Sequence, residues 1–477
     1  MTRSQPALQG EYVVRKFMDV EGRRLYGFEK NYFENAYSLS CIVHGFDVKF
    51  FKDDEKVRRA FRRVVKTSPI LQATVVGDTA ESCQFSKHKE EEDWPVIRIR
   101  DVSTDDQISK HATESREIEM QYICRGGKEA RLSSARIWIV RGVSRVSVCL
   151  VCPHHFADGA GLSVILTKLY LYCRTPKIFW VLFDRLSHDE VPTFEEMALK
   201  QDLPRLQGAD LERLRAEGPW GRPNVFNFQD YDMIQPDAVS KMSSLNEELK
   251  PVPAAAMKRC RTQLRKQGLT ITTCFQALAI KTMALLVDAT KMNSDNRDYI
   301  GITPVDCRKL GKWGLLRRDR KGTFPVVGNY SAALSTTVPA ETALSSSLED
   351  IAKIFKKDLD GIRNDVDARI RFLATNLSID AAYLTGVSSG IAPFKGIAFP
   401  SSGRIESLIS FGPMPHVWFY VVTCGSTTRI TVDIALPLAK KLDSHKFHQF
   451  IKSASKGSVL EPILNSGFFT PNKTPVL

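Results

Sequence analysis

The sequence has no hydrophobic run that approaches the roughly 18–20 apolar residues needed by a membrane-spanning helix. Its first residues, MTRSQPALQGEYVVRKF, lack the apolar core of a secretory signal. No internal repeat and no low-complexity tract occurs. These absences exclude membrane-spanning, secreted and repeat classes, and we expect a soluble cytoplasmic protein. The terminal segments EYVVRKFM and HKFHQFIKSASK are short for membrane anchors, so any membrane contact is expected to be peripheral.

Cysteine occurs 10 times but not in the arrangement of a metal or redox site. Only Cys149 and Cys152 form a C-x-x-C pair, with no second pair and no histidine at ligand spacing. Both belong to a strand-like run, in which residues three apart point to opposite faces. We therefore expect reduced core cysteines and no metal.

The charge balance is basic, with 67 lysines and arginines against 54 acidic residues and a net charge of +13. Such an excess favours an anionic partner, whether nucleic acid, an anionic membrane or a phosphate-bearing cofactor. The most basic run, RKLGKWGLLRRDRKG (308–322), lacks the interleaved aromatics of a single-stranded nucleic-acid groove. We expect no nucleic-acid partner, although a non-catalytic basic binding module stays open as an alternative.

The 477 residues exceed what one core usually fills, and the pattern of elements divides them. Strand-like and helical patterns alternate up to residue 173 and again from about 253, which predicts α/β (α+β) lobes. Residues 53–69 are typical of these helices, with a capping aspartate and one apolar face: Val57, Ala60, Phe61, Val64 and Val65. The stretch between is irregular and rich in Pro, Gly and charge. The predicted organisation is a first lobe over 1–180, a crossover over 181–250 and a second lobe over 251–477.

The segment HHFADG (154–159) carries the strongest chemical signal. It lies between a predicted strand and a predicted helix, where a tight loop can present a side chain. Histidine titrates near neutral pH and suits a general base, and Gly159 permits the sharp turn that Asp-Gly often makes. The alternative is a loop with two surface histidines and a helix-capping aspartate. GVSSG (386–390) matches a nucleophile elbow centred on Ser388, but no helical pattern follows it, which argues for a chance match.

Four segments in order resemble the fungal alcohol O-acetyltransferases, within the CoA-dependent acyltransferases that include the BAHD enzymes, the condensation domains and chloramphenicol acetyltransferase. HHFADG is similar to their H-x-x-x-D-G signature. RRLYGFEKNYFENAYSLSCIVH (23–44) resembles their opening motif, and CRTQLRKQGLTITTCFQALAI (260–280) the start of their second lobe. PVDCRKL (304–310) followed by GNYSAAL (328–334) resembles their Val-Asp-x-Arg and Gly-Asn strands.

The resemblance implies two chloramphenicol-acetyltransferase-like lobes, each a mixed sheet covered by helices, with an active-site tunnel between them. His154 stands three residues before Asp158 and so matches the catalytic histidine, whereas His155 is structural. Asp158 matches an aspartate that pairs with a second-lobe arginine, here Arg308. Such a bidentate pair would fix the loop that carries His154.

The same resemblance implies a monomer that transfers an acyl group from acetyl-CoA, as co-substrate, to the hydroxyl of a small alcohol. Three basic residues are candidates for the CoA phosphates: Lys312, Arg317 and Arg318. Ser410 and Thr423 are candidates for the oxyanion donor. The sequence departs from the BAHD enzymes, because ISFGPMPHVWF (409–419) stands where they carry D-F-G-W-G. Condensation chemistry on a carrier-bound acyl group, or on an amine acceptor, is the alternative.

Overall fold

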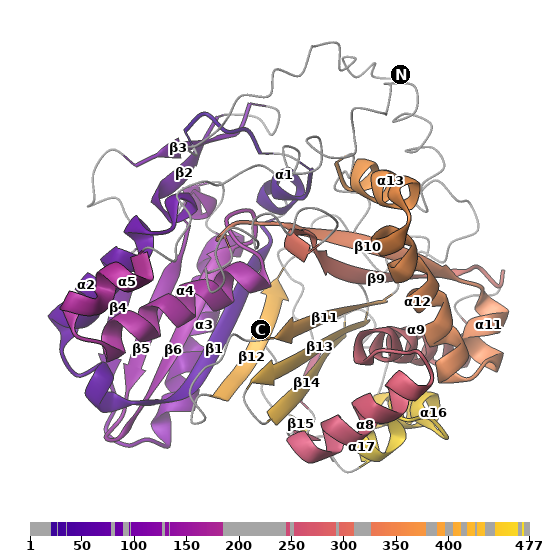
Figure 1. Cartoon of the computed structure of the whole chain (residues 1–477). Coiled ribbons are helices and arrows are strands. Elements are labelled where there is room, and N and C mark those ends of the chain that lie inside the picture. The colour runs from indigo at the N-terminus through magenta and orange to yellow at the C-terminus, as the bar shows by residue number, and fades with distance from the viewer. Residues whose placement is uncertain are drawn as a thin grey trace.

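The computed structural model describes residues 21–184, 245–248, 252–309, 326–377, 389–395, 404–411, 417–424, 427–434, 444–465 and 470–471, with short gaps inside 21–184 and 252–309. Over these residues the chain forms two lobes, each built on a β-sheet with helices packed against it (Figure 1). The α/β class predicted from the sequence is confirmed.

The first lobe is built on a five-stranded sheet of order β12-β1-β6-β5-β4. All neighbouring pairs are antiparallel except β4 and β5. The strands are β1 (Ser38–Asp47), β4 (Ile97–Asp101), β5 (Arg136–Arg141), β6 (Arg145–Pro153) and β12 (Arg404–Phe411). A small sheet pairs β2 (Ala73–Val76) with β3 (Gln84–Lys87).

Helices cover both faces of this first sheet. On one face α3 (Gln107–Arg125) packs over a small apolar cluster. On the other, α2 (Asp54–Lys66) and α4 (Gly159–Arg174) contribute to the larger core. Of the two aspartates that could cap α2, Asp53 or Asp54, the structure uses Asp53, and the five apolar residues named above are the buried ones, as predicted. The remaining helices of the lobe are α1 (Gly27–Glu34) and α5 (Trp180–Asp184).

The two cysteines of the C-x-x-C pair lie on opposite faces of β6. Cys149 belongs to the cluster under α3, whereas Cys152 belongs to the larger core. Burial raises the pKa of the Cys149 thiol to about 12, so it is not a reactive thiolate. Within the described part of the chain, no group of three or more His, Cys, Asp or Glu residues could hold a metal ion.

The second lobe is built on a larger sheet of order β10-β9-β11-β13-β14-β7-β15, with β8 also paired to β14. Its strands are β7 (Leu245–Glu248), β8 (Val252–Pro253), β9 (Tyr299–Asp306), β10 (Ser331–Val338), β11 (Ser389–Lys395), β13 (Val417–Cys424), β14 (Thr427–Ile434) and β15 (Thr470–Pro471). Its helices are α8 (Ala254–Lys266), α9 (Ile271–Ala289), α11 (Ala340–Ser345), α12 (Leu348–Asn364), α13 (Val366–Leu377), α16 (Ser444–Ser455) and α17 (Glu461–Asn465).

Helix α9 bears on the expectation that no helix spans a membrane. Among the described residues this helix, with 19 residues, is long and apolar enough by length and composition to cross a membrane. However, most of this helix is buried inside the protein, and it packs against α12, α16 and the second sheet. These contacts are those of a core helix.

Two segments do not follow the predicted lobe boundaries. Strand β12 lies in the predicted second lobe but pairs with β1 in the first sheet (Figure 1). Strand β7 lies in the predicted crossover but pairs with β14 and β15. The physical reason is the same in both cases, since a strand joins the sheet that completes its backbone hydrogen bonds. The larger core likewise includes second-lobe residues such as Ile302 and Tyr330, so the lobes share packed surface at their junction.

Candidate active site

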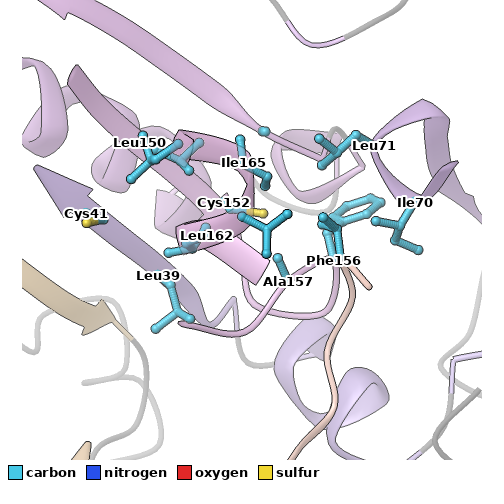
Figure 2. Close-up of a cluster of buried hydrophobic side chains, with 14 of the residues drawn as sticks. Leu39, Cys41, Ile70, Leu71, Leu150, Cys152, Phe156, Ala157, Leu162 and Ile165 are labelled. Carbon is cyan, nitrogen blue, oxygen red and sulfur yellow. The ribbon is translucent and has the colours of Figure 1, made fainter. Parts of the chain in front are cut away.

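The HHFADG segment is a short loop between β6 and α4. Its backbone is held at both ends, because the His154 amide donates to the Tyr37 carbonyl at 2.8 Å and the Asp158 amide to the Gly328 carbonyl at 3.1 Å. The side chains of Phe156 and Ala157 are fully buried in the core (Figure 2). Because these two side chains anchor the loop in the core, the neighbouring residues His155 and Asp158 are held in defined positions.

His155 points into the protein. Its Nε2 lies 3.1 Å from the Arg131 carbonyl, and its ring meets the Phe33 ring edge-on. Burial lowers the pKa of His155 to about 3, which keeps the ring neutral at physiological pH. Its surroundings are those of a packed core residue.

His154 is only partly buried and its ring stacks on Tyr32 of α1. The ring centroids are 4.0 Å apart and the planes differ by 21°. Nδ1 is buried and has no hydrogen-bond partner in the described part of the protein. Burial lowers the pKa of His154 to about 4, although nearby backbone groups and the Asp158 charge act in the opposite direction. The imidazole is therefore neutral near pH 7, and the Tyr32 ring sets its orientation.

Asp158 serves two structural purposes. It is the N-cap of α4, accepting from the Gly161 amide at 2.9 Å, and it also accepts from the Tyr330 amide at 3.0 Å. Two further hydrogen bonds come from the Arg308 guanidinium, at 2.8 and 3.1 Å. Four donors thus satisfy the carboxylate. The capping aspartate that stood as the alternative interpretation and the Arg308 ion pair are found together.

Arg308 follows β9 and is satisfied at every donor. Besides Asp158, its guanidinium donates to the Val326 carbonyl at 3.1 Å, the Gly328 carbonyl at 2.9 Å and the Asp306 carboxylate at 3.1 Å. It also lies 4.5 Å from the centre of the Tyr330 ring. Burial disfavours the charge, but Asp158 and Asp306 outweigh it and raise the pKa of Arg308. The pair ties the loop of the first lobe to two segments of the second.

Gly159 differs from its expected role. It is the first residue of α4 and is not among the described glycines with positive φ, so no glycine-only turn occurs there. The glycines that the site needs are elsewhere. A Cβ at Gly161 would lie 3.1 Å from that of Ala157, and one at Gly328 would lie 2.6 Å from the Tyr330 ring.

Replacing Gly328 by alanine is expected to destabilise the protein by about 1–3 kcal/mol, because the new methyl group overlaps a buried ring. Urea unfolding measures the effect. Gly361→Ala in α12 is the matched control, since its Cβ would meet nothing closer than 3.9 Å and alanine favours a helix. Equal stabilities of the two variants would contradict the role given to Gly328.

The other predicted site residues are less fully placed. Ser410 lies on β12 opposite Leu39, which in turn pairs with Cys152 two residues before His154. Thr423 lies on β13 of the second sheet, opposite Thr428. The side chains of both candidates are outside the described part of the structure, as are four whole residues: Lys312, Arg317, Arg318 and Ser388.

Sequence reasoning missed the tyrosines around His154. Tyr32 also bonds the Ser331 side chain of β10, and burial raises its pKa. Tyr37 meets Tyr32 edge-on at 5.1 Å, and its buried hydroxyl has no hydrogen-bond partner among the described groups. Both belong to the segment singled out as an opening motif, but nothing in its spacing indicates contact with a histidine 122 residues away.

The fold defines a class. Solved structures that superpose on this chain have the two-lobed fold of condensation domains and chloramphenicol-acetyltransferase-like acyltransferases. No family model and no curated protein matches the sequence.

Three of these structures illustrate the likeness. The TRI3 trichothecene 15-O-acetyltransferase from Fusarium sporotrichioides superposes with a TM-score of 0.61 at 14% identity, over 94% of this chain and 96% of its own. TRI101 of F. graminearum, solved with coenzyme A and deoxynivalenol, gives 0.59 at 11% identity over 89% and 98%. The first condensation domain of the CDA synthetase gives 0.56 at 14% over 94% and 99%. At such identities the likeness concerns the fold.

Proposed function

We propose that this protein is a CoA-dependent O-acyltransferase that uses His154 as general base. The observation that supports this most is the neutral imidazole of His154, fixed by Tyr32 and by the Asp158–Arg308 pair where the lobes of an acyltransferase fold meet. A base of this kind needs a free lone pair and a set direction, and the buried Nδ1 leaves Nε2 for that purpose.

In the proposed reaction, Nε2 of His154 removes the acceptor's hydroxyl proton as the oxygen attacks the thioester carbonyl. The tetrahedral oxyanion is stabilised by a hydrogen-bond donor, typically by about 3–4 kcal/mol. Ser410 is our candidate donor, with Thr423 as the second. Collapse breaks the carbon–sulfur bond, and the CoA thiolate takes the proton back from His154. No acyl-enzyme forms, because both substrates meet in one ternary complex.

The proposed substrates are supported by what two of the superposed structures bind or are named for. TRI101 was solved with coenzyme A and with trichothecenes, and TRI3 is described as an O-acetyltransferase. We therefore propose acetyl-CoA as donor and the hydroxyl of a small secondary metabolite or other alcohol as acceptor, with Lys312, Arg317 and Arg318 contacting the CoA phosphates. A tunnel between the lobes would admit the two substrates from opposite sides.

The direct test measures thiol release from acetyl-CoA across a panel of alcohols and amines, including deoxynivalenol. We expect release with at least one alcohol, accompanied by an acetyl ester of that alcohol. Release only from an acyl group presented on a phosphopantetheine carrier protein would favour the condensation alternative, which rests on the equally extensive match to condensation domains. Release from neither donor would contradict the proposal.

The pH profile tests His154 specifically. Its neutral form is the base, and because burial lowers its pKa to about 4, the acid limb of kcat/KM is expected well below pH 6.5. Tyr32→Ala exposes the ring to water and should move that limb upward toward 6.5, whereas Tyr122→Ala on α3 should not. An acid limb at the same pH in all three proteins would contradict this role of Tyr32.

Acid stability must be measured alongside these rates. Both His154 and His155 have a lower pKa in the folded protein than the ordinary 6.5, so the unfolded chain binds more protons between those values. Their neutral burial therefore stabilises the fold above about pH 6.5, and this contribution is lost as the pH falls toward 4 and 3. Rates are compared per folded molecule, with the folded fraction taken from circular dichroism.

A further inference from the structure

Four large apolar side chains lie exposed on one short stretch after α4. They come from the 3-10 turn Lys177–Phe179 and from α5, and we call them the α5 patch: Ile178, Phe179, Val181 and Leu182. Their exposed fractions are 77%, 49%, 48% and 51%. The other exposed large apolar residues in the described part of the chain are a pair on α3, Ile118 and Tyr122, and two single residues, Val76 and Val143. The patch is therefore a local concentration that the fold does not need for its core.

The α5 patch is held outward by anchors on either side. Trp180 is buried in the middle of the stretch, and its indole N–H donates to the Tyr172 carbonyl at 3.0 Å. At the end of α5, Asp184 accepts from the Arg63 Nε at 3.0 Å and from the Tyr172 hydroxyl at 2.8 Å. Because these contacts fix the backbone, the apolar side chains face outward as a consequence of the fold.

The surroundings of the patch are basic. Arg174 and Lys177 directly precede it and are exposed. Helix α2, which Arg63 ties to α5 and which lies beside it in Figure 1, carries six basic and two acidic residues. Arg59 and Arg62 are exposed on that helix. A second copy of the chain docked symmetrically on the patch would bring these cations against one another, so the charge favours an anionic partner.

An anionic partner that also takes aliphatic side chains is a lipid surface. Nucleic acid offers phosphates but no apolar layer, and three of the four patch residues are aliphatic, which cannot stack on bases. We propose that the α5 patch inserts among the acyl chains of an anionic membrane while Arg174, Lys177 and α2 contact the lipid phosphates. The contact is peripheral and reversible, and it does not depend on the acyl-transfer reaction.

Vesicle co-sedimentation of the full chain tests this proposal. Vesicles of phosphatidylcholine with about one third phosphatidylserine are compared with pure phosphatidylcholine, at two salt concentrations. We expect binding to the anionic vesicles that weakens with salt and is at least about tenfold weaker on the neutral ones. The double variant Ile178→Ser/Phe179→Ser should lower it by about tenfold or more, and Lys177→Gln by about fivefold.

Matched controls separate the patch from general charge and hydrophobicity. Val143→Ser removes a lone apolar side chain that is 72% exposed, and Lys110→Gln removes an exposed cation on α3, so both should bind as the wild type does. Unchanged melting temperatures would show that all variants fold. The proposal is overturned if the wild type ignores anionic vesicles, if the patch variants bind as well as the controls, or if the patch variants dissociate a dimer and leave vesicle binding unchanged.

Discussion

His154→Ala is expected to lower kcat/KM for acyl transfer by about 10²–10⁴ while leaving the protein folded. The loss has a local cause, since the variant keeps the loop backbone, the buried Phe156 and the four hydrogen bonds to Asp158. Alanine removes only the group that would take the acceptor's proton. Steady-state thiol release, with the melting temperature measured in parallel, checks both parts of the expectation.

The neighbouring histidine provides the matched control. His155→Asn removes a buried ring that contacts Phe33 and the Arg131 carbonyl, so it should lower stability more than His154→Ala does. Its rate per folded molecule should fall by no more than a few-fold. If the two variants showed the reverse pattern, the base would be His155 and the assignment by spacing to Asp158 would be wrong.

Local features of the fold could be predicted from the sequence because they depend on nearby residues. Helix α2, with its aspartate cap and its apolar face, follows from hydrophobic periodicity and capping signals alone. The placement of HHFADG between a strand and a helix follows in the same way. The partnership of Asp158 with Arg308, 150 residues apart, came instead from a resemblance, because no local pattern encodes such a contact.

What the sequence could not provide depends on packing between distant segments. Tyr32 reaches His154 only because α1 lies against the β6–α4 loop, and no periodicity in α1 indicates this. Strand β12 was readable as a strand, but its choice of the first sheet is decided by the free edge of β1. Helix α9 also needs the packing to be interpreted, since length and composition alone do not distinguish a buried core helix from a membrane-spanning one.

Arg308→Ala is expected to be the most destabilising of the substitutions considered, by about 3–5 kcal/mol. Its guanidinium and the Asp158 carboxylate are both 5% exposed, so the variant leaves a buried carboxylate without its cation. Three other groups that accept hydrogen bonds from the Arg308 guanidinium also lose this donor: the Val326 and Gly328 carbonyls and the Asp306 carboxylate. Urea unfolding gives the free energy directly. Lys353→Ala, which breaks a pair whose members are 62% and 55% exposed, should change it by less than about 1 kcal/mol.

A second substitution can show why Arg308→Ala lowers the free energy of unfolding. If the unpaired carboxylate dominates, Asp158→Asn added to Arg308→Ala should recover part of the lost stability, because the buried charge is then absent. Arg308→Lys should fall between wild type and alanine, since an ammonium keeps the charge but cannot make the two parallel bonds. The loop that carries His154 is fixed by the same pair, so thiol release per folded molecule should fall in the same order as stability. A stable Arg308→Ala protein with a full rate would show that the loop is held by its core side chains alone.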